Sequence, residues 1–184
     1  YYMRESTKKK LGRFSTAVVI VLAVLAVFVT MQPDDTHVER SAVVKASPQE
    51  VYAYVNNLDN WNSFSPWADL DPNAKISYEG PRAGEGAVFR WDGNSEVGEG
   101  SMKIVESVSG ESVRMDLEFI RPMPGKSTAM FKLEPVEGGT NVTWSSNWKN
   151  NFMAKAVSLV IDCEAMTGGY FEQGLENLRA QVEK

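Results

Sequence analysis

The chain has 184 residues, of which 43% are hydrophobic and 10% aromatic, and its formal net charge is −5. This composition supplies the core of a folded domain and excludes an intrinsically disordered chain. The acidic balance argues against a nucleic-acid partner, because phosphate binding needs clustered Lys and Arg. The single cysteine, Cys163, excludes an intramolecular disulfide and a cysteine-based zinc site.

The N-terminal segment combines a basic flank with an apolar run. Residues 17–31 contain no charged side chain, and the uncharged stretch extends back to residue 14. As a helix this stretch is about 27 Å long, close to the ~30 Å hydrocarbon core of a bilayer. We therefore predict a transmembrane helix over residues 14–32, preceded by a cytoplasmic N-terminus (residues 1–13) and followed by a linker (residues 33–35). The N-terminus is basic through Arg4, Lys8, Lys9, Lys10 and Arg13.

The charges on either side of this run predict its orientation. The positive-inside rule keeps the basic N-terminus in the cytoplasm and exports the remainder. In a Gram-negative bacterium the helix would cross the inner membrane once, and the domain of residues 36–184 would be periplasmic. A cleaved signal peptide has a similar pattern, but Thr30, Met31, Gln32 and Pro33 offer no small-x-small cleavage site. We expect an uncleaved signal anchor.

The exported domain begins with a strand and a helix. Residues 37–44 are rich in β-branched residues and predict a strand. Ser47, Pro48 and Glu50 then form the pattern of a capping box with Pro at the first helical position, and an apolar face at helical spacing follows. The segment Trp61–Trp67 holds three aromatics around a Pro, which suits a short irregular helix or a loop.

From residue 75 the pattern alternates with a period of two, which predicts six further strands. They are expected at residues 75–79, 87–91, 99–107, 112–120, 127–135 and 140–148, mostly separated by Gly, Pro or Asn. The clearest of them alternates the apolar residues Val113, Met115, Leu117 and Phe119 with charged ones. Such a strand belongs to an antiparallel sheet that is covered on one side.

The last segment returns to helical spacing. Phe171, Leu175, Leu178 and Val182 share one stripe, which predicts a long amphipathic C-terminal helix. A shorter helix is expected over residues 152–161, with Gly168 and Gly169 as a flexible joint between the two. The fold class is thus α+β, a curved seven-stranded antiparallel sheet around one long helix, and an apolar cavity is expected between them.

Several motifs in this order resemble the START-like superfamily, and within it the polyketide cyclase/dehydrase and lipid-transport proteins of the helix-grip fold. The resemblance covers roughly residues 36–183 and rests on short motifs: Ser47-Pro48-Gln49-Glu50-Val51-Tyr52, Trp61 to Trp67, Gly84-x-Gly86 before Phe89-Arg90-Trp91, Gly138-Gly139-Thr140-x-Val142-Thr143-Trp144, and Phe171-Glu172-x-Gly174-Leu175-x-Asn177-Leu178. It implies a pocket for lipids, polyketides or other apolar molecules. It does not imply catalysis.

Catalytic and metal sites are not expected. His37 is the only histidine and follows the anchor closely. The Asp69-x-Asp71-x-Asn73 motif resembles a calcium loop but lacks the required Gly and final Glu, so a turn is the better interpretation. No cofactor is expected. The polar residues weighed as possible acids, bases or anchors are Arg90, Asp92, Glu99, Arg114, Asp116, Asp162 and Glu164.

The aromatic residues carry the stronger signal for a ligand site. The predicted lining residues are Trp61, Phe64, Trp67, Phe89, Trp91, Met115, Phe119, Phe131 and Trp144, with core packing as the competing interpretation. The hypothesis is a membrane-anchored module that binds an apolar small molecule, membrane protein partners, or both. The alternatives are an accessory subunit of a larger membrane complex, for which Ala17, Ala23 and Ala26 would allow close helix packing, and a cyclase or dehydratase acting in the cavity.

Overall fold

The computed structural model describes the backbone of residues 2–184 and the side chains of residues 16–184. It divides into two compact units. One unit comprises Tyr1–Asp34 and Asn150–Asp162, and the other comprises Asp35–Lys149 and Cys163–Lys184. Each is described by itself. The basic side chains predicted to flank the anchor lie outside the described side chains.

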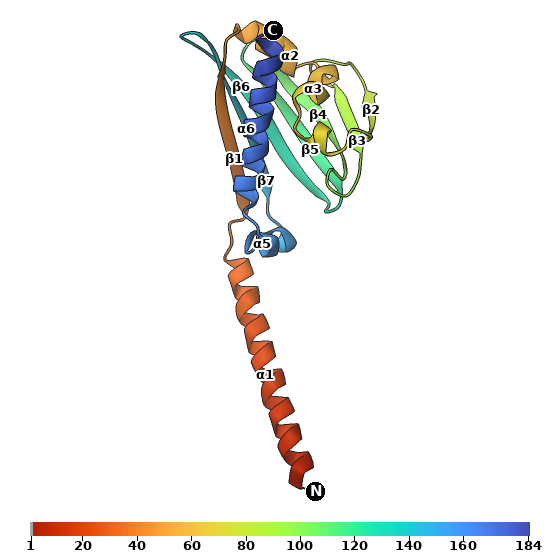
Figure 1. Ribbon diagram of the computed structural model, residues 1–184, viewed down its shortest axis with the longest axis vertical. Coiled ribbons are helices and arrows are strands. Elements are labelled where there is room, and N and C mark those ends of the chain that lie inside the picture. The colour runs from red at the N-terminus through yellow and green to blue at the C-terminus, as the bar shows by residue number, and fades with distance from the viewer. Residues whose placement is uncertain (1) are drawn as a thin grey trace. The chain divides into compact units, whose positions relative to one another are not determined.

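The larger unit contains one antiparallel sheet of seven strands in the order β1-β7-β6-β5-β4-β3-β2 (Figure 1). The strands are β1 (Asp35–Val44), β2 (Lys75–Glu79), β3 (Val88–Asp92), β4 (Glu99–Val108), β5 (Ser112–Arg121), β6 (Gly125–Val136) and β7 (Gly139–Lys149). All seven were predicted, and most bounds differ from the prediction by one or two residues. The first strand pairs with the last, which joins the two ends of the domain.

Local sequence signals explain the start of the first domain helix. Helix α2 (Pro48–Val55) has Ser47 as its N-cap, and the Ser47 hydroxyl accepts a hydrogen bond from the backbone N–H of Glu50. The Glu50 carboxylate accepts one in return from the Ser47 backbone N–H, at 2.8 Å. This reciprocal pair is the predicted capping box. Three short helices follow, η1 (Leu58–Asn60), α3 (Trp61–Phe64) and α4 (Trp67–Leu70).

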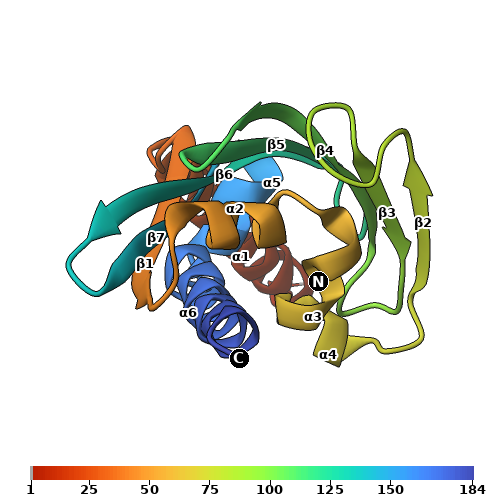
Figure 2. The same ribbon diagram turned by 90° about the horizontal axis from the view of Figure 1, so that it is seen from above.

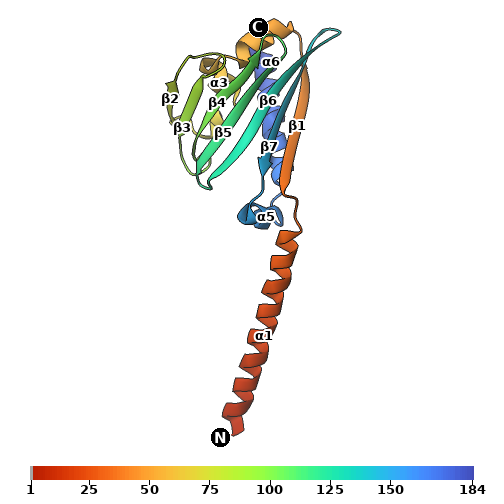
Figure 3. The ribbon, with the colours of Figure 1, turned by 180° about the vertical axis from the view of Figure 1, so that it is seen from behind.

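The long helix α6 (Cys163–Val182) lies within the curve of the sheet (Figure 2). Viewed from behind, the sheet lies in front of α6, so the helix covers only its concave face (Figure 3). Leu175 and Leu178 belong to the same buried core as Val113 and Met115 of β5. The strand that α6 contacts most is β1, at the edge of the sheet. The predicted position of the terminal helix on the apolar face of the sheet is confirmed, whereas its direct packing on β5 is not.

The predicted joint at Gly168 and Gly169 is wrong, because both residues lie inside α6. Gly168 instead permits a close approach to β1. A Cβ at this position would lie 2.1 Å from a guanidinium nitrogen of Arg40. The break between the last two helices falls at residues 159–162, after α5 (Phe152–Ser158).

The smaller unit contains α1 (Tyr2–Thr30) and α5, which contact each other. Val29 of α1 is buried, whereas the large apolar residues from Val18 to Phe28 are exposed. In the part of the chain that the structure describes, no helix meets the length and hydropathy needed to cross a membrane.

Candidate functional site

The concave face of the sheet carries a cluster of aromatic rings centred on Trp144 of β7. Phe171 of α6 stacks on its indole with 4.4 Å between ring centroids and 8° between planes. Phe131 of the neighbouring strand β6 lies 4.7 Å away. The centre of the space between helix and sheet is therefore occupied by stacked rings.

The segment between α2 and β2 closes this cluster from the other side. Trp61, Phe64 and Trp67 each meet Trp144 edge-on, at 5.7, 6.4 and 6.0 Å between centroids. These residues come from α3 and α4, two helices of four residues each. Edge-to-face contacts of this kind are favourable for aromatic pairs. The Trp61–Trp67 segment therefore packs its three aromatic rings against the central tryptophan of the sheet.

A glycine in α6 sets the distance between the helix and this ring. A Cβ added to Gly174 would lie 2.6 Å from Cζ3 of Trp144 and 3.2 Å from Cδ of Pro66. Any larger side chain would therefore push the helix away from the sheet or tilt the indole. Gly174 was recognised only as part of a family motif, because its role depends on a contact between distant segments.

The indole nitrogen of Trp144 is a buried donor without an acceptor. Its Nε1 atom has no hydrogen-bond partner among the described residues, although the side chain is only 2% exposed. A buried N–H that forms no hydrogen bond costs about 1–3 kcal/mol. Such a group calls for a specific explanation, such as an acceptor supplied by a bound molecule.

The cluster reaches the surface at one edge. Trp67 is half-buried, and its ring lies 5.4 Å from that of Tyr170 on α6. Sequence reasoning did not select Tyr170 or Phe171 as site residues. Phe171 belonged to the predicted apolar stripe of the helix, and that stripe was the available signal.

The remaining predicted aromatics form a second group on β3 and β5. Phe89 and Trp91 lie 6.2 Å apart, and Trp91 and Phe119 lie 6.0 Å apart. Trp91 also borders a shallow groove of about 220 Å³, lined by Lys75, Ile76, Ser77, Arg90, Asp92, Glu99, Gly100 and Ile120. Met115 is fully buried in the core. The structure thus divides the predicted lining residues into a central cluster, a lateral group and a core methionine.

The charged residues near the groove form ion pairs with one another. Arg90 donates to the Glu79 carboxylate at 2.8 Å, and this hydrogen bond lowers the pKa of Glu79 below its ordinary value. Arg121 pairs with Glu99 and Asp92 at 2.8 and 2.5 Å. These groups are exposed except for the half-buried Glu99, and paired charges of this kind are typical of a solvated strand surface.

The other polar candidates are also engaged in local contacts. Arg114 pairs with Glu106 at 2.9 Å, and Glu164 pairs with Arg40 at 3.0 Å. Hydrogen bonds to Glu164 and Glu172 raise the pKa of Arg40. His37 lies 2.7 Å from the side-chain oxygen of Asn147.

The residues of the incomplete calcium motif form a turn. Asp71 accepts hydrogen bonds from the backbone N–H groups of Asn73 and Asn94, at 3.1 and 2.7 Å. The described residues contain no group of three or more His, Cys, Asp or Glu side chains that could hold a metal ion.

Comparison with known families shows which family this domain belongs to. A family model described as polyketide cyclase/dehydrase and lipid transport matches residues 35–183. The chain belongs to this family. Its matched region begins at β1 and ends at the end of α6, so it includes every residue of the aromatic cluster. None of the curated proteins compared with the chain matches it significantly in sequence.

Solved structures agree with the family in fold. Protein CV1439 from Chromobacterium violaceum is 18% identical with a TM-score of 0.58, covering 83% of this chain and 99% of that protein. The Aha1 dimer from Colwellia psychrerythraea is 18% identical with a TM-score of 0.57, covering 80% and 96%. The di-domain ARO/CYC StfQ from the steffimycin biosynthetic pathway is 13% identical with a TM-score of 0.59, covering 81% of this chain and 51% of StfQ. At these identities the similarity shows the fold alone.

Proposed function

We propose that the protein is a membrane-anchored START-like module that binds an apolar molecule carrying an oxygen acceptor, of the lipid or polyketide type. The observation that carries this proposal is the buried Nε1 donor of Trp144, which has no acceptor among the described residues. A carbonyl or hydroxyl oxygen of a ligand would satisfy it. The aromatic side chains that surround Trp144 suit a ligand that is otherwise apolar.

Entry of such a ligand requires an opening beside Trp144. The segment that covers the indole consists of short helices, and Trp67 at its edge is half-buried against Tyr170. Short helices with few internal hydrogen bonds depend on tertiary contacts for their stability. Displacement of α4 and Trp67 would expose one edge of the Trp144 ring without disturbing the sheet. The match to a family of cyclases and lipid-transport proteins supports this use of the concave face.

The experiment is photo-crosslinking in cells that produce the full chain. Trp67 is replaced by p-benzoylphenylalanine, and Val136, an exposed residue of β6, is replaced in a matched control. We expect a discrete adduct with one class of apolar molecule at position 67, identified by mass spectrometry after lipid extraction. The absence of an adduct, or the same adduct at position 136, would contradict the proposal.

A second variant tests the donor itself. Trp144→Phe keeps an aromatic ring but removes the N–H, so it should reduce the yield of the adduct at position 67. An unchanged yield would show that the ligand does not accept a hydrogen bond from Trp144.

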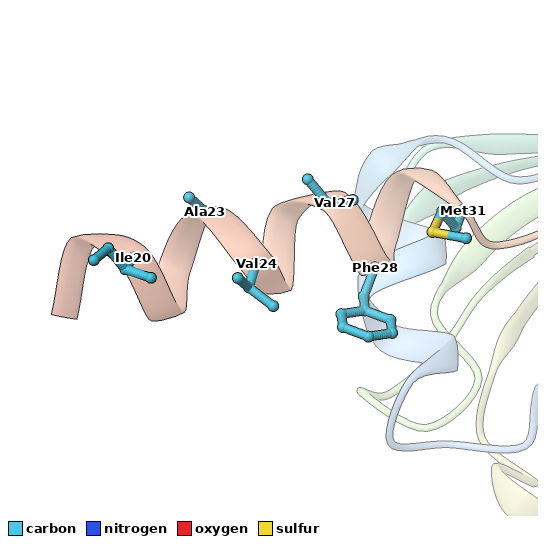
Figure 4. A pocket seen from close by; sticks show the side chains of 6 residues that line it. All are labelled: Ile20, Ala23, Val24, Val27, Phe28 and Met31. Carbon is cyan, nitrogen blue, oxygen red and sulfur yellow. The ribbon is translucent and has the colours of Figure 1, made fainter. Parts of the chain in front are cut away.

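The proposal includes an anchor at residues 14–32 with the domain outside the cytoplasm, at the periplasmic side of a bacterial inner membrane. It is supported by residues 17–30 of α1, which carry no charged side chain and expose large apolar residues from Val18 to Phe28. Figure 4 shows six apolar side chains that line an open hollow of about 330 Å³, five on α1 and one just after it: Ile20, Ala23, Val24, Val27, Phe28 and Met31. A helix that is apolar all round requires an apolar surrounding. Retention of the full chain in membranes washed with alkaline carbonate would agree, and release would contradict it.

The hollow also favours a second candidate function, an accessory subunit held by other membrane helices. Ala23 is one of its lining residues, and small residues allow neighbouring helices to approach closely. Purification in mild detergent through a tag at Lys184 tests this function. Stoichiometric recovery of another membrane protein would support it, and recovery of this chain alone would favour the ligand-binding module. The alternative of a cyclase or dehydratase predicts a turnover that Asp162→Asn or Glu164→Gln would abolish.

A further inference from the structure

The segment from Phe152 to Ile161 has the opposite polarity to an ordinary surface helix. Its large exposed side chains are apolar: Phe152, Met153, Leu159, Val160 and Ile161. Val160 is 84% exposed. The only charged residue of the segment, Lys155, has a side chain that is 11% exposed. A helix in water would place these groups the other way round.

Contacts within the smaller unit hold this segment at the end of α1. The backbone N–H of Asn150 donates to the carbonyl of Asp34 at 2.7 Å, and its side-chain amide donates to the carbonyl of Pro33 at 3.1 Å. The ammonium of Lys155 forms an ion pair with the Asp34 carboxylate. Lys155 therefore faces the α1 terminus, which leaves the apolar residues on the outside.

The contacts of Asn150 and Lys155 with residues 33 and 34 indicate what covers the exposed apolar residues of the segment. The exposed apolar surface of α1 continues through Phe28 and Met31 to the residues that bind α5. If residues 14–32 span the bilayer, residues 33 and 34 lie at its surface, and α5 is held at that level. An amphipathic segment at this depth inserts its apolar side chains at the boundary between headgroups and acyl chains.

We propose that α5 and residues 159–161 form a second contact with the lipid bilayer, a surface-inserted element beside the proposed anchor. This inference rests on the proposed anchor. It adds a contact between the bilayer surface and a different segment of the chain. The lipid contact would restrict rotation of the smaller unit about the helix axis. Lys155 contributes by pairing with the Asp34 carboxylate at the membrane surface.

Lipid-specific fluorescence quenching in the full chain tests the proposal. Cys163 is replaced by Ala, and an environment-sensitive fluorophore is attached through one new cysteine in each of three variants, Val160→Cys, Val24→Cys and Val136→Cys. Each is reconstituted into vesicles that contain lipids spin-labelled in the headgroup region or deep in the acyl chain. Val24 reports the anchor, and Val136 reports an exposed strand of the larger unit.

At position 160 we expect shallow quenchers to act about twofold or more strongly than at position 136, and deep quenchers to act most strongly at position 24. Quenching at 24 without quenching at 160 would overturn the surface contact and leave the anchor intact. No quenching at either position would overturn both. A blue-shifted but unquenched probe at 160 would show that protein, and not lipid, covers the segment. Phe152→Cys provides a second attachment site if Val160→Cys fails to reconstitute.

Discussion

The close approach of α6 to Trp144 can be tested with two alanine substitutions in the same helix. Gly174→Ala places a methyl group 2.6 Å from Cζ3 of Trp144, whereas the Cβ of Gly169→Ala would meet no heavy atom within 4 Å. Both positions lie within Cys163–Val182 and both gain helix propensity. Comparing the two variants therefore separates the effect of helix propensity from the effect of packing against Trp144.

The expected magnitudes follow from these two terms. Replacing Gly by Ala in a helix interior stabilises by about 0.5–1 kcal/mol. Adding a methylene-sized group to a close-packed site costs about 1–3 kcal/mol. Phe171 and Phe131 both pack closely against the Trp144 ring, so the ring has little freedom to move. We expect Gly169→Ala to raise the free energy of unfolding by about 0.5–1 kcal/mol, and the value for Gly174→Ala to fall about 1–3 kcal/mol below that of Gly169→Ala.

The measurement is the thermal unfolding of the full chain in one detergent. Unfolding is monitored by the near-ultraviolet circular dichroism of the tryptophans. For a domain of this size, each kcal/mol corresponds to roughly 2–4 °C in Tm. The difference between the two variants is the quantity to interpret, because the propensity gain is common to both. Equal shifts for Gly174→Ala and Gly169→Ala would refute the packing of α6 against Trp144.

Two further predictions concern hydrogen-bonded pairs. Ser47→Ala should lower the free energy of unfolding at neutral pH by about 1 kcal/mol through loss of the N-cap. The hydroxyl and backbone N–H of Ser47 lower the pKa of Glu50 below its ordinary 4.5, so the stabilisation is present above that value and is lost as the pH falls through the lower folded-state pKa. Denaturant titrations at neutral and acidic pH should show the wild type and Ser47→Ala converging, and a constant difference would contradict the prediction. For the buried hydroxyl pair Ser127 and Ser146, 2.6 Å apart, either single Ala variant should cost about 1–3 kcal/mol and the double variant less than the sum, which a double-mutant cycle measures.

Much of the fold is determined by local sequence signals. The alternation along Val113 to Phe119 fixes which side of β5 is apolar, and the Ser47 and Glu50 pair fixes where α2 begins. These signals act within one strand or one turn, so they can be read without knowledge of the partner. The apolar stripe of the terminal helix likewise indicated which face would meet the sheet.

Which aromatic residues come together in the candidate site depends on contacts between distant segments. The sequence indicated that Trp61, Trp67 and Trp144 are aromatic and share an apolar environment. Only the strand register and the path of the chain after α2 bring their rings together around one indole and leave Phe89, Trp91 and Phe119 in a separate group.

Gly168 and residues 150–162 also show the difference between what the sequence indicates and what tertiary contacts decide. A Gly-Gly pair is a reasonable joint by sequence, but Gly168 lies inside α6, where the absence of a Cβ leaves space for the guanidinium of Arg40 of β1. Residues 150–162 read as part of the exported domain, yet their hydrogen bonds to Pro33 and Asp34 group them with the N-terminal helix. Sequence periodicity reports the environment of a residue along its own element. Which elements meet, and which polar groups they leave unpaired, is decided only when the chain has packed.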